Sequence, residues 1–313
     1  MRFTQAQFAE RSERHRHELQ VHCYRMLGSF EEAEDLVQET MLRAWRRRGD
    51  LERDEHLRAW LYSIATNACL DAIKAKRRRL PALGSFRDIP WLEPYPDALL
   101  EPQAPDSAAP DASAIGRETI ELTFLAVIQL LPPRQRAVLI LRQVLDWPAR
   151  DVADVLEIGV AAVNSALQRA RATLREHRPT EAREDWAASE VTATERAVLD
   201  GYMAAHESGD PQATLALIRD DIRVTMPPAP YLFEGRDAIL ELVARAADTG
   251  DWRLTPTRAN RQPAAACYLR APGDTAYRAF KIDVLRIADG LVAEVTTFGA
   301  KHFRAFGLPA VLP

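Results

Sequence analysis

The sequence predicts a multidomain protein in which two all-α modules precede an α+β domain. Apolar residues recur at helical spacing in two separate stretches, a proline-rich segment divides these stretches, and strand-like alternation begins only beyond about residue 220. The length of 313 residues suits two or three domains at about 150 residues each. We expect a helical module at 1–80, a linker at 81–114, a second helical module at 115–180 and an α+β domain at 190–313.

The first stretch predicts three amphipathic helices. Ser29 and Glu32 have the S-x-x-E spacing that caps a helix start, so the second of these helices is expected from about Phe30 to Arg48. The apolar positions that define the three helices include Leu19, Cys23 and Met26, then Leu36, Val37 and Met41, and then Leu57, Leu61 and Ile64.

The linker is defined by its proline content. Seven of the 20 prolines fall between Pro81 and Pro110. Because proline removes a backbone donor and disfavours helix in the residue before it, we expect a stiff, extended segment. Trp91 and Tyr95 are aromatic residues in this segment that could contact another part of the protein.

Beyond the linker, the sequence predicts helices at 115–131, 134–144, 148–156 and 160–177. The last two, joined by a turn that we place at Gly159, match a helix-turn-helix pair that packs over small apolar residues. Amide side chains can bond adenine edges and arginine can bond guanine or phosphate, so the polar face of the last helix suits a major groove. An ordinary helical hairpin with a solvated face has the same pattern. The polar residues are Asn164, Ser165, Gln168, Arg169 and Arg171.

Two helix faces of the first module could also bind partners. Residues 74–79 hold five cations in six positions, which suits capture of a single nucleic-acid strand, although the helix dipole alone favours cations at a helix end. An acidic face on the second helix could dock on a basic partner, and it also stabilises the helix start. The residues concerned are Asn67, Asp71, Lys74, Arg77 and Arg78 on one helix and Asp35, Gln38 and Glu39 on the other.

From residue 194 the sequence predicts helices at 194–208, 211–219 and 236–247 and strands at 221–226, 252–258, 265–270, 276–287 and 291–298. Asp221, Asp283 and His302 are the ionisable residues that could serve as acid or base, although such residues in strand-rich segments are usually structural. Apolar and aromatic residues are expected to form the core or a pocket wall, namely Met226, Tyr231, Phe233, Trp252, Tyr268, Tyr277, Phe280 and Phe298.

Charge and cysteine content exclude several classes of protein. The 41 basic and 45 acidic residues give a net charge of −4, so any binding of nucleic acid must depend on local patches. Three distant cysteines without a C-x-x-C pair argue against a disulfide framework and a structural zinc site, and we expect no metal and no cofactor. We see no export signal and no run of about 18 apolar residues, so we expect a cytoplasmic protein that does not contact a membrane.

Several segments resemble known families. Residues 33–45 (AEDLVQETMLRAW) and 58–71 (RAWLYSIATNACLD) resemble region 2 of bacterial extracytoplasmic-function (ECF) sigma factors of the sigma-70 class. Residues 131–139 (LPPRQRAVL), together with the helix-turn-helix, resemble region 4 of the same family. Residues 194–306 are similar in element order to SnoaL-like domains, which are cone-shaped α+β folds appended to some of these sigma factors.

The resemblance implies an alternative sigma factor, not an enzyme, that binds core RNA polymerase and directs promoter recognition and transcription initiation. It implies that Asp35, Gln38 and Glu39 bind the β′ clamp helices, with the β flap as a further partner. The face from Asn67 to Arg78 would meet the −10 element, and the face from Asn164 to Arg171 would read the −35 duplex. The family often has a cation where Asn164 stands, which leaves the preferred −35 sequence open.

The resemblance also implies a regulatory role for the C-terminal domain. We expect it to act in cis, touching the linker at Trp91 and Tyr95 or one of the helical modules, and it could bind a small ligand.

Two other function classes stay open at this point. A ligand-responsive helix-turn-helix regulator would bind duplex DNA as a dimer without polymerase, and it leaves the acidic face around Asp35 without a role. A SnoaL-type isomerase or hydrolase with a DNA-binding appendage would require a bound substrate and a catalytic carboxylate.

Overall fold

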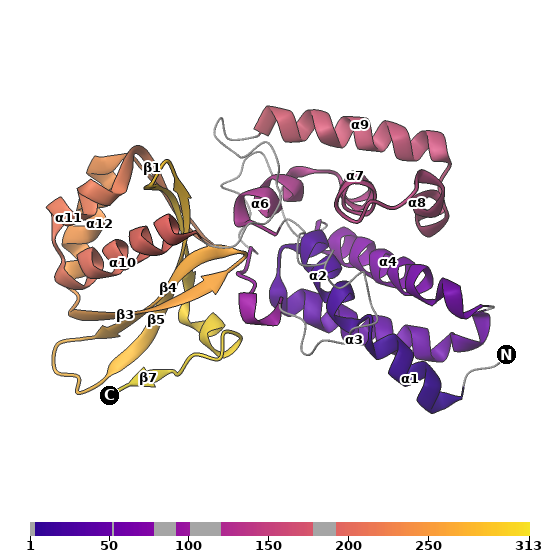
Figure 1. Ribbon diagram of the computed structural model, residues 1–313, viewed down its shortest axis with the longest axis horizontal. Coiled ribbons are helices and arrows are strands. Elements are labelled where there is room, and N and C mark those ends of the chain that lie inside the picture. The colour runs from indigo at the N-terminus through magenta and orange to yellow at the C-terminus, as the bar shows by residue number, and fades with distance from the viewer. Residues whose placement is uncertain (1–3, 52, 78–91, 101–119, 178–191) are drawn as a thin grey trace. The chain divides into compact units, whose positions relative to one another are not determined.

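The computed structural model describes residues 4–51, 53–77, 92–100, 120–177 and 192–313 (Figure 1). The chain forms two compact units. Unit 1 comprises residues 1–86 and 113–186, and unit 2 comprises residues 87–112 and 187–313. Residues 92–100, the described part of the linker, therefore belong to the C-terminal unit.

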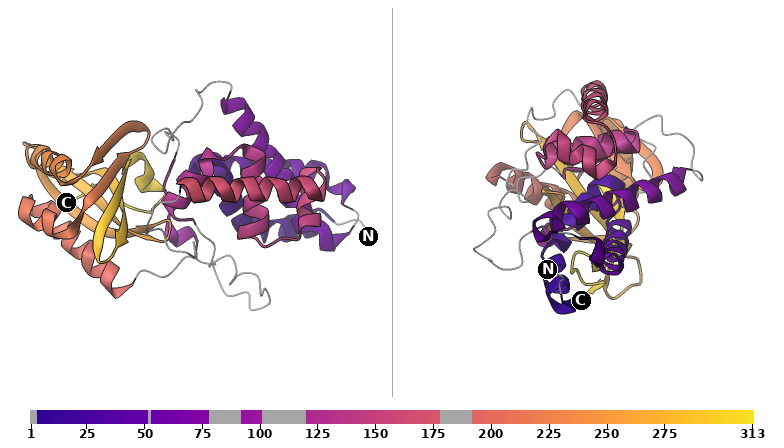
Figure 2. Two further views of the ribbon diagram at one scale, coloured as in Figure 1. Left: turned by 90° about the horizontal axis from the view of Figure 1, so that it is seen from above. Right: turned by 90° about the vertical axis from the view of Figure 1, so that its right-hand side faces the viewer.

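Unit 1 is helical throughout its described residues (Figures 1 and 2). Helices α2, α3 and α4 pack against one another, and α9 packs against α6, α7 and α8. Short 3-10 turns connect α3 to α4, and a π-helical turn at Ile140–Val144 continues α7. The helices are α1 (Gln5–Glu13), α2 (Arg16–Leu27), α3 (Phe30–Arg46), α4 (Leu57–Arg77), α6 (Leu122–Leu130), α7 (Pro133–Leu139), α8 (Ala149–Leu156) and α9 (Val160–His177).

The structure confirms the predicted start of α3 and the turn through Gly159 before α9. The Ser29 hydroxyl accepts the N–H of Glu32 at 3.2 Å, as the capping motif predicts. The turn begins at Glu157, whose backbone is left-handed with φ 52°. The carbonyl of Gly159 accepts the N–H of Val163 at 3.1 Å and so begins α9. A residue other than glycine can end a helix in this left-handed conformation at a modest cost.

A buried arginine joins the two helical modules of unit 1. Arg136 on α7 is 3% exposed and donates to the carbonyl of Met26 at the end of α2. It also donates to the carbonyls of Gln129 and Leu131 at 2.7 and 3.3 Å, and the Gln129 amide donates to the carbonyl of Arg25 at 3.1 Å. The last carbonyls of a helix have no partner within the helix, so Arg136 caps α2 and α6 together. This role accounts for Arg136, the second arginine of the LPPRQR motif (residues 131–136).

A second contact lies between α4 and the segment around α8. The rings of Tyr62 and Trp147 lie 5.0 Å apart between centroids, and the guanidinium of Arg58 lies 5.8 Å from the Trp147 ring. The Ser63 hydroxyl donates to the carbonyl of Val155 at 3.4 Å. The two helical modules therefore fold as one unit.

Unit 2 is a mixed sheet with α10, α11 and α12 packed on it (Figures 1 and 2). The strand order is β2-β1-β6-β5-β4-β3, with β7 paired to β5, and every pair is antiparallel except β1 with β6. The elements are α10 (Ala193–Ser208), α11 (Pro211–Leu217), β1 (Ile218–Met226), β2 (Ala229–Glu234), α12 (Arg236–Ala247), β3 (Asp251–Ala259), β4 (Gln262–Arg270), β5 (Tyr277–Ala288), β6 (Leu291–Gly299) and β7 (Val311–Leu312), with a 3-10 turn at Ala300–Arg304.

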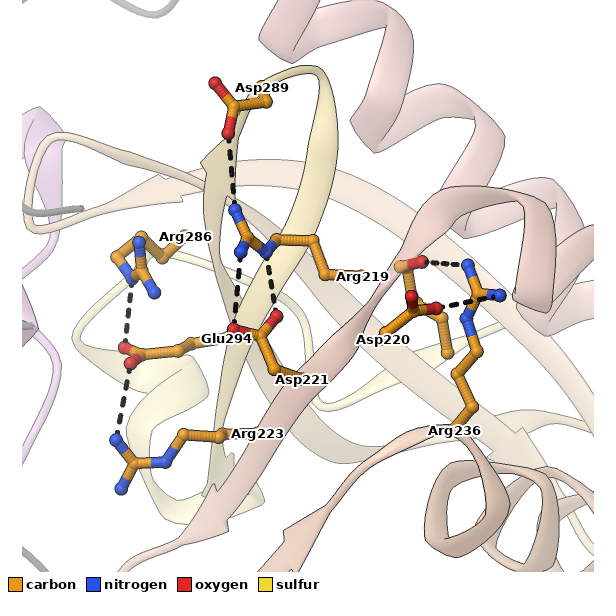
Figure 3. A network of polar contacts seen from close by, with 9 residues as sticks. Arg219, Asp220, Asp221, Arg223, Arg236, Arg286, Asp289 and Glu294 are labelled. Carbon is orange, nitrogen blue, oxygen red and sulfur yellow. Dashed lines mark hydrogen bonds and ion pairs between the residues drawn. The ribbon is translucent and has the colours of Figure 1, made fainter. Parts of the chain in front are cut away.

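The sheet carries a network of ion pairs on β1, β5 and β6 (Figure 3). Glu294 pairs with Arg286 at 3.2 Å and with Arg223 at 3.7 Å, and Arg219 pairs with Asp221 at 2.8 Å. The labelled residues comprise four arginines and four carboxylates, so their charges cancel. A patch without net charge does not attract a polyanion.

Candidate functional surfaces and pocket

One face of α4 is polar and exposed. Asn67, Asp71 and Lys74 follow one another at intervals of four and three residues, so they share a face, and all three are exposed. Leu61, Ala65 and Ala68 on the other side of α4 are buried in unit 1. The helix is thereby fixed with an amide, a carboxylate and an ammonium group toward solvent. Arg77 is the last residue of α4, and Arg78 lies outside the described residues.

The second helix of the helix-turn-helix, α9, also has one buried side and one exposed polar side. Val163, Ala170 and Leu174 of α9 are buried, as the sequence predicts. The Nε of Arg171 donates to the side chain of Gln143 at 3.1 Å, which orients this guanidinium. A helix with amide and guanidinium groups on one face can enter a major groove, which is about 12 Å wide. The exposed residues of this face are Asn164, Ser165, Gln168, Arg169 and Arg171.

The polar face of α3 contains one apolar residue that sequence reasoning missed. Asp35 and Gln38 are exposed, and Glu39 is half-buried and pairs with Arg43 at 2.8 Å. Leu42 lies one turn beyond Gln38 and is 51% exposed. A leucine in an amphipathic helix is normally assigned to the core. The helical spacing of Leu42 from Asp35 and Gln38, however, places it on the polar face, and this spacing could have identified it from the sequence. An exposed leucine beside carboxylates suits a protein partner better than nucleic acid.

Residues 92–100, which we call the strap, dock on unit 2. The N–H of Tyr95 donates to the side-chain oxygen of Asn260 at 2.8 Å, and the N–H of Asn260 donates back to the carbonyl of Tyr95 at 2.9 Å. Asp97 accepts the N–H of Arg261 at 2.8 Å. Tyr95 is fully buried and Asp97 is 5% exposed.

Two ion pairs flank these backbone contacts. Asp97 pairs with Arg258 at 3.2 Å, and Glu93 pairs with Lys301 at 2.6 Å. The strap is thus held by both charges and hydrogen bonds, most of them at the β3–β4 turn. Trp91, the other aromatic residue singled out in the linker, lies outside the described residues.

Unit 2 contains a cavity of about 540 Å³ between its helices and the sheet. Its wall is mostly aliphatic and aromatic. Met226, Tyr231, Trp252 and Phe280 line the cavity, as expected of a pocket wall. The other aromatic and apolar residues of that prediction, Phe233, Tyr268, Tyr277 and Phe298, lie outside the wall.

None of the three acid or base candidates lines this cavity. Asp221 is exposed and pairs with Arg219. His302 is buried, and burial lowers its pKa to about 4. Asp283 is 0% exposed and accepts the hydroxyl groups of Tyr202 and Thr297 at 2.9 and 2.6 Å. Its carboxylate is therefore engaged within the protein.

The three cysteines are buried free thiols. Over the part of the chain that the structure describes, no helix has the length and apolar character needed to cross a membrane.

Comparison with protein families gives three matches in chain order. Residues 12–79 match sigma-70 region 2, residues 121–174 match sigma-70 region 4, and residues 199–295 match the SnoaL-like domain.

Curated relatives are sigma factors. The ECF RNA polymerase sigma factor SigG of Mycobacterium tuberculosis is 41% identical over 319 residues, which cover 96% of this chain and 84% of that protein. The ECF RNA polymerase sigma factor SigW of Bacillus subtilis is 29% identical over 153 residues, which cover 49% of this chain and 79% of that protein.

A solved structure shares the fold. The extracytoplasmic function sigma factor SigJ of Mycobacterium tuberculosis superposes with a TM-score of 0.65 at 22% identity, covering 96% of this chain and 99% of that chain. The predicted class, two helical modules followed by an α+β domain, is confirmed.

Proposed function

This chain belongs to the ECF sigma factors of RNA polymerase, and on that premise we propose that three helix faces divide the work of promoter recognition. The face of α3 docks on the β′ clamp helices, the exposed face of α4 meets the −10 strand, and the exposed face of α9 reads the −35 duplex. The observation that carries this assignment is that each face is solvent-exposed while the opposite side of its helix is buried. The chain acts in the cytoplasm, where core polymerase and promoter DNA meet.

The docking face has the chemistry of a protein interface. Asp35 and Gln38 offer acceptors to a basic helix, and Leu42 adds an apolar contact that can exclude water. A polymerase-independent regulator would leave this face unused, so we do not favour that alternative. The β flap is our second proposed contact on core polymerase.

The DNA-binding faces supply part of the free energy that opens the promoter, and polymerase supplies the rest. Separating the strands costs stacking energy, and the amide and ammonium groups of Asn67 and Lys74 can offset part of it by binding one strand. With a net charge of −4 and few phosphate contacts, the free chain should bind duplex DNA weakly. Affinity should therefore appear when core polymerase holds both regions on one promoter.

Transcription reconstituted from purified core polymerase and the full chain tests the assignment of α9. We expect run-off products from a subset of genomic fragments, and we expect Gln168→Ala to reduce output from these fragments about tenfold because one base contact is lost. Gln212→Ala removes the same side chain from the exposed start of α11 and should leave output unchanged. Equal output from both variants would show that Gln168 makes no contact that matters for recognition of the −35 element.

We also propose that unit 2 regulates the sigma factor in cis by holding the middle of the linker. Regions 2 and 4 are joined through this linker, and the strap within it belongs to unit 2. The docked strap therefore ties residues 92–100 of the connection between the two DNA-binding regions to unit 2. The simplest consequence is inhibition that is relieved when the strap leaves unit 2.

Releasing the strap should raise promoter output about threefold in the reconstituted assay. In the variant Asn260→Gly/Asp97→Ala, glycine at position 260 tolerates the left-handed φ of 57°. The variant removes the side-chain contacts of Asn260 and Asp97 between the strap and the β3–β4 turn, and it leaves the Glu93–Lys301 pair in place. Asp289→Gly is the matched control, since Asp289 is also left-handed, with φ 52°, and lies in the β5–β6 turn away from the strap. Lower output from the strap variant than from the control would contradict inhibition in cis.

We propose no catalytic role for unit 2. A general base needs a free lone pair within reach of its substrate, and Asp283 is buried behind the cavity wall with its oxygens bonded to Tyr202, Thr297 and Lys281.

A further inference from the structure

The wall of the cavity in unit 2 has few polar groups left for a ligand. The Thr214 hydroxyl donates to the carbonyl of Asp210 at 3.1 Å. The Thr249 hydroxyl and the Trp252 indole N–H both donate to the carbonyl of Ala246, at 2.6 and 2.9 Å. These groups line the cavity but are satisfied by the protein. A molecule in this space therefore meets mostly apolar surface.

The charged residue Lys281 in the wall is compensated. Its Nζ lies 2.7 Å from Asp283, which is also bonded to Tyr202 and Thr297. Burial opposes ionisation of both groups, yet their mutual attraction raises the pKa of Lys281 and lowers the pKa of Asp283. The pair stays ionised with no net charge. An ammonium group has three donors, and the contact with Asp283 uses one of them.

His206 offers a second donor position at the same part of the wall. Its Nε2 is buried and has no hydrogen-bond partner among the described residues. Its ring lies edge-on to Trp252 at 5.1 Å, and the Nζ of Lys281 lies 5.6 Å from the same Trp252 ring. Burial and the nearby Lys281 ammonium lower the pKa of His206 to about 4, so the imidazole is neutral at pH 7. A buried polar atom without a partner is costly, and a ligand atom would remove this cost.

We propose that the cavity binds a neutral, mainly apolar small molecule carrying a carbonyl group, and that this carbonyl oxygen accepts from His206 Nε2 and from the Lys281 ammonium. The volume of about 540 Å³ lies within the usual range for sites of drug-sized ligands. The Lys281–Asp283 pair and the neutral His206 leave no net positive charge at this part of the wall. Arg245, another cation of the wall, is exposed and pairs with Glu241 at 3.7 Å, so we expect a neutral ligand. A carboxylate would be desolvated in an apolar cavity without compensation. This inference goes beyond the sigma-factor activity and concerns unit 2 alone.

Three probes that share a dimethylaminonaphthalene ring system test, on the purified full chain, whether the cavity prefers a neutral carbonyl group. The neutral ketone 6-propionyl-2-dimethylaminonaphthalene changes its emission with the polarity around its carbonyl. We expect it to bind at one site, at least tenfold more tightly than 2-dimethylaminonaphthalene, which lacks the carbonyl, and than 6-dimethylamino-2-naphthoate, which carries a charge. Tighter binding of the naphthoate would overturn the neutral class of ligand, and no binding of the ketone would overturn the site.

Two variants of the cavity wall and one control variant locate the probe. Leu242→Trp fills the cavity from α12 and should weaken ketone binding at least tenfold, whereas Val311→Trp adds the same ring at an exposed position of β7 and should not. His206→Phe keeps an aromatic ring beside Trp252 but removes the donor, so it should weaken the ketone about fivefold and leave the carbonyl-free probe unchanged. Equal weakening of both probes by His206→Phe would contradict the carbonyl contact. Because these measurements need no polymerase, their failure would not bear on the sigma-factor assignment.

Discussion

Reversing the two carboxylates of the docking face should abolish assembly with core polymerase. In the variant Asp35→Arg/Glu39→Arg, two acceptors for a basic partner become two repelling cations, while the buried side of α3, with Ala33 and Val37, is untouched. Like-charge contacts across an interface cost several kcal/mol, so the affinity for core polymerase should fall at least a hundredfold. Titration of labelled full-length chain with core enzyme measures this loss directly.

The control carries the same change of charge elsewhere on unit 1. Glu10→Arg/Glu13→Arg reverses two exposed carboxylates on α1, whose ion pairs with Arg14 and Arg16 are solvent-exposed and contribute little. This variant should bind core polymerase like the native chain. If the α3 variant also retains native affinity while its thermal unfolding is unchanged, the polymerase must dock on another face.

The periodic parts of the fold could be predicted from the sequence. Helix α9 begins and ends where its apolar spacing and flanking residues place it, and α12 has the predicted bounds as well. The exposed faces of α4 and α9 follow from the same period, because a helix that buries one side must present the other. Segments with a strong local signal can therefore be placed from the order of their residues alone.

The rest depends on contacts that sequence spacing does not encode. Strand β2 follows two prolines and β7 has two residues, so neither has a readable alternation. The strap is fixed by Asn260, whose left-handed backbone and side-chain amide meet a segment 165 positions away. Arg136 has the local pattern of a surface cation, and only the meeting of α2 and α6 around it makes it a buried cap. Whether such a side chain is buried depends on partners that are distant in the sequence, and these partners cannot be identified from the sequence alone.

The packing of region 2 on region 4 limits the distance that the exposed faces of α4 and α9 can span. The −10 and −35 elements lie about 25 base pairs apart, or about 85 Å along duplex DNA at 3.4 Å per pair. A compact unit of about 160 residues has a radius of gyration of about 15 Å and a diameter of about 40 Å. Unit 1 in its closed form cannot place α4 and α9 on both elements at once. If α4 and α9 have the roles proposed above, we infer that initiation requires the contacts between α4 and the α8 segment, and those of Arg136 and Gln129 with the end of α2, to open.

Weakening those contacts should raise transcription at limiting sigma concentration. The Tyr62–Trp147 ring pair, the Arg58 contact and the Ser63 hydrogen bond together stabilise the closed form by about 2 kcal/mol. Ser63→Trp inserts a bulky neutral side chain at the half-buried centre of this interface, and output should rise about thirtyfold because less energy is spent on opening. Ser63→Ala removes only the 3.4 Å hydrogen bond and should raise output less than threefold. A folded Ser63→Trp chain with native or lower output would show that the closed contact is no barrier to initiation, and that the regions separate at no cost once core polymerase binds.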